Sequence, residues 1–209
     1  MKIYAISGLG ADERVFKFLD LNYKIIPLNW VDNYKNESIE SYSKRLAEKI
    51  DTEEEFAILG LSFGGLIATE MNKFLNPKTT ILISSIETKN ELPLIYKVGG
   101  KLNFTKLIPD NLLTKSNQFV EFLFGTKKKK LLNNIITESN PIFSKWALNA
   151  LLTWQNTTRI KNVLKISGSK DKLFPPSKNA IIIEKGTHFM IVDKAQEVSK
   201  LINNYFKNI

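Results

Sequence analysis

One pentapeptide limits the folds open to this chain more than any other feature, because it places a serine between a strand-like and a helix-like run. Ser62 is the middle residue of the sequence GLSFG, which follows the apolar run 56–59 and precedes the helical run 65–71. A turn tight enough to lift this hydroxyl clear of a sheet has no room for Cβ atoms two residues to either side, where Gly60 and Gly64 stand. The order strand, Gly-x-Ser-x-Gly, helix predicts a nucleophile elbow at Ser62.

Strands and helices alternate over the first 88 residues. Apolar runs predict strands at 2–6, 24–28, 56–60 and 79–84, and the stretches between them predict helices at 12–19, at 38–50 with Ser38 as its cap, and after the elbow up to Pro77. This alternation predicts right-handed βαβ units and a parallel sheet. The strands are continuous apolar runs, which is typical of a sheet buried on both faces.

The rhythm changes between residues 87 and 159, where no strand pattern appears. We expect one helix around Phe119 and another that begins with Asn140 as N-cap and Pro141 as its first residue. Strands resume at 163–167 and 179–183, and a last helix begins near Asp193, with Gln196 as a capping-box partner. The sequence therefore predicts an α/β fold, a three-layer αβα sandwich whose mostly parallel sheet has about six strands.

A serine needs a base to accept its proton and an acid to orient that base. The only histidine, His188, follows the last predicted strand, in a loop that can reach the sheet edge near Ser62. Asp171 follows the preceding strand across a glycine-containing turn. A structural histidine and an ordinary turn aspartate are the alternatives, but Ser, Asp and His occur in the chain order expected of this architecture. We predict that these three residues form a catalytic triad.

An acyl-transfer site also needs two N–H donors for its oxyanion. We expect one from the backbone of Phe63, directly after the serine, and the other from Leu9 in the loop Ser7–Gly10 after the first strand. The alternative for this loop is a phosphate-binding glycine turn. It lacks the Gly-x-Gly-x-x-Gly and Gly-Lys-Ser/Thr patterns, which argues against a nucleotide.

With these motifs the chain resembles the α/β-hydrolase superfamily. The resemblance rests on the loop SGLG, the elbow GLSFGG, the segment GSKDKLFPP and the sequence GTHF, and it leaves out about 70 residues before Ile160. It implies a core formed by residues 1–88 and 161–209, and a helical cap inserted at residues 89–160. Ser7 stands where many relatives have histidine, and the chain starts directly at the strand that bears this loop, so the resemblance implies a minimal form with about six strands.

Composition narrows the chemistry further. The 209 residues include no cysteine and one histidine, which excludes disulfides, thiolate metal sites and multi-histidine metal sites. We expect no metal and no cofactor. The net charge is +9, but the lysines appear scattered, and the run Lys127–Lys130 is typical of a solvated helix face or loop. We therefore expect no nucleic-acid partner. No signal peptide or membrane span is evident, which predicts a cytoplasmic protein without an integral membrane segment.

These observations favour hydrolysis of a carboxylic ester or thioester of a small-molecule acyl substrate, through an acyl-enzyme on Ser62. An acyltransferase or amidase of the same fold, and a non-catalytic small-ligand-binding protein that retains the fold, are the alternatives. The aromatic residues of the expected cap favour an acyl or aromatic substrate, although they could equally pack on the core: Phe119, Phe122, Phe124, Trp146 and Trp154. The sequence leaves the substrate-binding residues and the oligomeric state open.

Overall fold

The computed structural model describes residues 1–102, 104–109, 113–177 and 179–209. Its centre is a sheet of six parallel strands, as the sequence predicted, and their order in the sheet is β2-β1-β3-β4-β5-β6. The strands are β1 (Lys2–Ile6), β2 (Lys24–Pro27), β3 (Phe56–Leu61), β4 (Thr79–Ile83), β5 (Val163–Gly168) and β6 (Ile181–Ile183). Because β3 lies between β1 and β4, the residue that follows it, Ser62, stands near the middle of the sheet's carboxyl edge.

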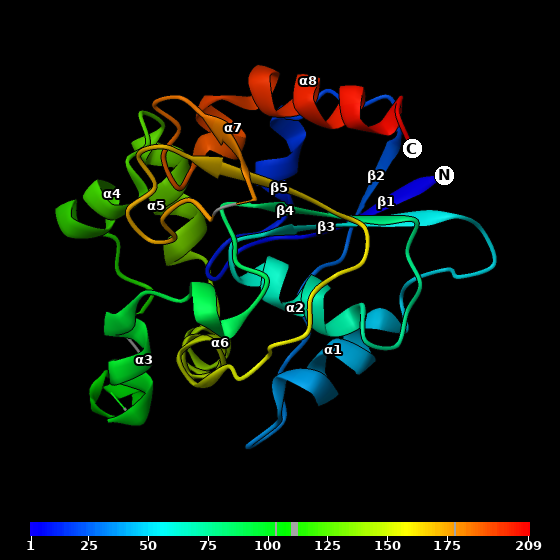
Figure 1. Ribbon diagram of the computed structural model, residues 1–209. Helices are drawn as coiled ribbons and strands as arrows, with labels where there is room; N and C mark the ends of the chain where they lie inside the picture. The colour runs from blue at the N-terminus through cyan, green and yellow to red at the C-terminus, as the bar shows by residue number, and fades with distance from the viewer. Residues whose placement is uncertain (103, 110–112, 178) are drawn as a thin grey trace.

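Helices cover both faces of the sheet and make it the middle of three layers (Figure 1). On one face lie α1 (Ile39–Ala47) and α2 (Phe63–Met71), and on the other lie α7 (Met190–Asp193), α8 (Ala195–Phe206) and the 3-10 helix η1 (Glu13–Phe18). Successive residues of β1 alternate between the two cores: Ile3 belongs to the core under α8 and Tyr4 to the core under α2. Both faces of the strands are buried, which explains their continuous apolar sequence.

The last helix begins near Asp193, as predicted, but the capping box predicted for it was wrong. Asp193 is the final residue of α7, Lys194 stands at the N-cap of α8, and no side chain caps this helix. The backbone N–H of Lys194 donates to Met190 O and that of Val198 donates to Lys194 O, so hydrogen bonding passes from α7 into α8 with little interruption. A helix that follows directly on another has fewer orphan N–H groups for a capping box to satisfy.

Residues 89–160 form an insertion between β4 and β5, which we call the inserted segment. Its described residues form helices and no strand: η2 (Lys89–Glu91), α3 (Leu94–Lys101), η3 (Phe104–Leu107), α4 (Gln118–Phe124), α5 (Lys129–Thr137) and α6 (Pro141–Thr153). As predicted, Asn140 caps α6 by accepting hydrogen bonds from the N–H groups of Ile142 and Phe143. Figure 1 shows these helices beside the carboxyl edge of the sheet.

Buried carboxylates anchor the two ends of this segment. Glu87 lies just before the inserted segment, and Ile160 is its last residue. The carboxylate of Glu87 accepts a 2.7 Å hydrogen bond from the N–H of Ile160 and forms a 2.9 Å ion pair with Arg159. Near the same end, the indole N–H of Trp154 donates to the buried carboxylate of Glu70 on α2 at 2.8 Å. A buried carboxylate is stable only when it is paired, so these contacts hold both ends of the insertion against the core.

Candidate active site

Ser62 occupies a strained turn between β3 and α2. Its backbone has φ 51° and ψ −121°, in the positive-φ region that residues other than glycine rarely adopt. Its N–H donates to Ile83 O on β4 at 3.0 Å, and the Ser85 hydroxyl donates to its carbonyl at 2.6 Å. These bonds hold the turn, and the Ser62 side chain remains partly exposed. Strain of this kind is characteristic of functional sites.

The two flanking glycines are required by close backbone contacts, as the sequence predicted. A Cβ on Gly60 would lie 2.5 Å from the Cα of Gly65 in α2, and a Cβ on Gly64 would lie 2.3 Å from the carbonyl oxygens of Ile6 and Ser7. The turn is therefore pressed between its own helix and the end of β1. The atoms that would collide belong to the backbone, so side-chain rotation could not relieve the contact.

We expect Gly64→Ala to lower the free energy of unfolding by about 2 kcal/mol or more, because overpacking against a backbone forces the elbow to shift. Gly99→Ala is the matched control, since a Cβ there meets its nearest atoms at ordinary distances of 3.8 and 3.9 Å and the residue lies in α3. Alanine should stabilise that helix slightly. Urea denaturation followed by circular dichroism would measure both; equal stability of the two variants would contradict the prediction.

The structure brings Ser62, His188 and Asp171 into one hydrogen-bonded chain. His188 Nε2 lies 2.9 Å from Ser62 Oγ, and His188 Nδ1 lies 2.9 Å from Asp171 Oδ2 and 3.0 Å from Oδ1. His188 and Asp171 are both buried. With a proton on Nδ1 donated to Asp171, Nε2 is left as an acceptor for the Ser62 hydroxyl. Such a chain can withdraw a proton from a serine that attacks an electrophile.

Two glycines allow the loops that carry Asp171 and His188 to meet. A Cβ on Gly168, at the end of β5, would lie 2.3 Å from the carbonyl oxygen of Gly186, which accepts a 2.8 Å hydrogen bond from the N–H of Lys170. The backbones therefore touch directly just before each functional side chain. This contact brings the two loops together beside Ser62.

Opposing effects act on the pKa of Asp171. Burial by itself disfavours the charged form and raises this pKa. The positive charge of His188, its hydrogen bond, and the N–H groups of Phe174 and Leu173 act in the opposite direction, and together they hold the pKa of Asp171 below its ordinary value. Asp171 is therefore a carboxylate at neutral pH, the state in which it accepts the Nδ1–H of His188.

Aromatic rings enclose His188, and one of them was missed in the sequence. The ring of Phe124 from α4 lies 5.2 Å from the imidazole, and the ring of Phe174 lies 5.6 Å from it, both in edge contacts. The sequence signal that could have identified Phe174 was its position three residues after Asp171, within the same turn. Trp146 from α6 meets the ring of Phe63 at 6.0 Å. The inserted segment thus contributes Phe124 to the surroundings of His188, whereas Trp146 packs on the ring of Tyr42 at 4.4 Å and donates its indole N–H to Glu37 O.

Of the five aromatic residues that the sequence singled out, three remain: Trp154, Phe119 and Phe122. Trp154 is buried and hydrogen-bonded to Glu70, so it anchors the inserted segment to α2. Phe119 and Phe122 are exposed on α4. Of the two interpretations that the sequence allowed for these five aromatics, packing on the core describes Trp154 and Trp146, and contact with the site describes Phe124. The exposed ring of Phe122 lies under the ammonium group of Lys172.

The expected oxyanion donors border Ser62. Gly8 lies so close to it that a Cβ on Gly8 would be 3.1 Å from Ser62 Cβ, and Leu9 follows Gly8. Phe63 is the first residue of α2, where the N–H points out of the helix. Within the described residues, neither the Leu9 nor the Phe63 backbone N–H donates a hydrogen bond. Both donors are thus available to an oxygen atom bound beside Ser62.

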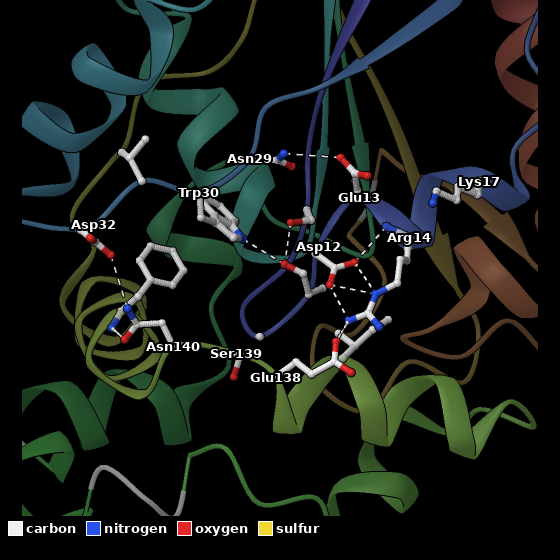
Figure 2. Close-up of a pocket in the computed structure, with 16 residues that line it drawn as sticks. Asp12, Glu13, Arg14, Lys17, Asn29, Trp30, Asp32, Glu138, Ser139 and Asn140 are labelled. Atoms are coloured by element: carbon white, nitrogen blue, oxygen red, sulfur yellow. Dashed lines mark hydrogen bonds and ion pairs between the residues drawn. The ribbon is translucent and has the colours of Figure 1, made fainter.

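A cavity of about 620 Å³ borders the Ser7–Gly10 loop, between the core and the inserted segment. Figure 2 shows Arg14 among the residues that line it, with its guanidinium between the carboxylates of Asp12 and Glu138, at 2.6 and 2.7 Å. The volume suits a small molecule. Ser7 and Gly10 of this loop line the cavity, and Ser62 is not among its lining residues.

Comparison with known proteins finds matches in structure only. No protein-family profile matches the chain, and neither does any curated protein sequence. Among solved structures, a thermophilic esterase from Thermogutta terrifontis matches with a TM-score of 0.75 at 13% identity, over 100% of this chain and 90% of that one. MenH from S. aureus matches with a TM-score of 0.73 at 15% identity, over 100% and 94%.

A lipase-esterase related protein from Clostridium acetobutylicum matches with a TM-score of 0.70 at 18% identity, over 97% of this chain and 93% of that one. At these identities the likeness concerns the fold, and it extends over nearly the whole of both chains. The chain has the fold of the α/β-hydrolase superfamily.

Proposed function

We propose that this protein is a serine hydrolase that cleaves carboxylic esters or thioesters. The observation that carries the proposal is the hydrogen-bonded chain from Ser62 through His188 to Asp171, at an elbow with two unoccupied N–H donors. The names of the structural neighbours, an esterase and a lipase-esterase related protein, are consistent with ester hydrolysis. For the compartment, the cytoplasm remains the prediction made from the sequence.

In the proposed mechanism, Ser62 Oγ attacks the carbonyl carbon while His188 Nε2 accepts the hydroxyl proton. The carbonyl oxygen becomes an oxyanion and accepts hydrogen bonds from the N–H groups of Leu9 and Phe63. Collapse of the intermediate breaks the bond to the alcohol or thiol, which leaves with the proton from His188. Water then attacks the acyl-enzyme, His188 takes its proton, and a second collapse releases the acid and restores Ser62.

The inserted segment, residues 89–160, is proposed to act as a cap domain on a core of residues 1–88 and 161–209. One contact supports this role, because the ring of Phe124 lies 5.2 Å from the imidazole of His188. This apolar side chain favours an acyl chain or an aromatic group near Ser62. Among the described residues, no helix has the length and apolar character needed to cross a membrane.

A fluorophosphonate probe tests the proposal without knowledge of the substrate, because it reacts only with an activated serine. We expect the protein to be labelled, with the adduct mapped to the peptide that contains Ser62. A set of p-nitrophenyl esters of increasing chain length, assayed beside acyl-CoA thioesters, would then define the leaving group and the acyl length. A folded protein that is not labelled would instead support the non-catalytic ligand-binding alternative.

We expect activity to decline in a single step as the solution is acidified. A protonated His188 cannot accept the Ser62 proton, so the active form is lost as this group gains a proton. Since the pKa of Asp171 is held below its ordinary value, its own protonation would follow only at more acidic pH. The logarithm of kcat/KM should therefore fall with a slope corresponding to one proton. A fall with a slope of two, or a flat profile, would argue against this assignment.

A further inference from the structure

An exposed apolar surface runs along the outer side of the inserted segment. Six large apolar side chains of α3, its C-terminal end and η3 are exposed, with Leu94 and Ile95 each 75% accessible. We call this set the outer apolar surface: Leu94, Ile95, Val98, Leu102, Phe104 and Leu107. Figure 1 shows α3 at the outer end of the molecule, with α6 between it and α2. A contiguous apolar area of this kind usually marks an interaction site.

Helix α3 is packed with its apolar side outward. At about 100° per residue, positions 94, 95, 98 and 102 fall within an arc of about 100°. The opposite side carries Gly99 and Gly100, and a Cβ on Gly100 would lie 2.1 Å from the carbonyl oxygen of Leu152 on α6. This close backbone approach requires the glycine side to face α6. The apolar stripe therefore cannot turn inward by rotation of the helix.

The stretch of chain that contains this surface has a high net positive charge. Residues 89–137 contain nine lysines and three acidic residues, a net charge of +6 out of the +9 of the whole chain. Lys97 and Lys101 lie on α3 beside the apolar stripe, and Lys101 is exposed.

We propose that the outer apolar surface docks on an anionic lipid bilayer. A short helix with an exposed apolar stripe edged by lysines is suited to lie in the interfacial plane, where the apolar side chains enter the acyl boundary and the ammonium groups meet anionic headgroups. A second copy of the chain fits poorly, because it would bring two surfaces of like charge together. The proposal is independent of the proposed hydrolase function and is measured by binding alone.

Vesicle flotation tests this docking directly. The full-length protein is mixed with vesicles of phosphatidylcholine alone, or of equal parts phosphatidylcholine and phosphatidylglycerol, at low and high salt. We expect flotation with the anionic vesicles, weakened by salt because the lysine contribution is screened, and little flotation with the neutral ones. Failure to float with anionic vesicles, or equal flotation with both kinds, would overturn the proposal.

Two double variants test which residues make the contact. Leu94→Ser with Ile95→Ser, and Lys97→Gln with Lys101→Gln, should each weaken partitioning onto anionic vesicles by about tenfold or more. The control for the first variant is Phe74→Ser with Ile209→Ser, two exposed apolar residues outside the inserted segment. The control for the second is Lys200→Gln with Lys207→Gln, two exposed lysines near the C-terminus. Circular dichroism would establish that all four variants fold.

Three outcomes would overturn the assignment of this surface. In the first, the control variants weaken flotation as much as the α3 variants do. In the second, the α3 variants float like the wild type. In the third, gel filtration shows a dimer that Leu94→Ser with Ile95→Ser converts to a monomer, so that a second copy is the occupant. A wild type that floats with neither kind of vesicle would instead favour an acidic protein as the partner of this surface.

Discussion

Replacement of Ser62 by alanine should abolish fluorophosphonate labelling and lower ester hydrolysis by about 10³-fold or more. The variant keeps the elbow but lacks the oxygen that attacks, and the remaining N–H donors can stabilise an oxyanion only for an attacking water. Because Ser62 is partly exposed and alanine fits the same turn, the free energy of unfolding should change by less than about 1 kcal/mol. Gel-based labelling, initial rates and urea denaturation measure the three quantities.

Ser139→Ala is the matched control for this experiment. Ser139 lines the cavity beside the Ser7–Gly10 loop, and its hydroxyl donates to Ile136 O and has no basic partner. We expect this variant to be labelled at the wild-type rate. Labelling of the Ser62→Ala protein at any other serine would show that the nucleophile has been misassigned.

Asp171→Asn should lower kcat by roughly 10³- to 10⁴-fold while the protein stays folded. The reason lies in the hydrogen bonds around the carboxylate. Oδ1 accepts from the N–H groups of Leu173 and Phe174, both at 2.9 Å, so an asparagine must place its oxygen there. Its NH₂ group then takes the position of Oδ2 and donates to His188 Nδ1. That bond selects the tautomer with the proton on Nε2, which cannot accept a proton from Ser62.

Asp51→Asn is the control, since Asp51 also accepts a backbone N–H, from Glu53, but pairs with Lys2 at the amino end of β1. Its kcat should equal that of the wild type. The two tautomers of His188 can be distinguished by nitrogen NMR, which is unambiguous here because the chain has one histidine. An Asp171→Asn variant with near wild-type kcat, or with the proton still on Nδ1, would contradict this account.

The sheet and the three residues proposed for the triad were accessible from the sequence because their signals are local. Continuous apolar runs specify strands buried on both faces, and glycines at fixed offsets from Ser62 specify the elbow. Parallel strands end at one edge, so residues placed after β3, β5 and β6 had to come near one another. The prediction that Asp193 opens a capping box was wrong, because a capping pattern in the sequence does not reveal that α7 runs into α8.

What the sequence by itself determined is therefore the strand order along the chain, the turn that exposes Ser62, and the identity of the base and acid that could serve it. Only the tertiary structure decided which aromatic residues touch His188, that Trp154 is an anchor to Glu70, and that α3 turns its apolar stripe outward. The physical reason is the range of the interactions. Backbone conformation follows from neighbouring residues, whereas contacts such as Gly100 on Leu152 join segments far apart in the chain and depend on how those segments pack.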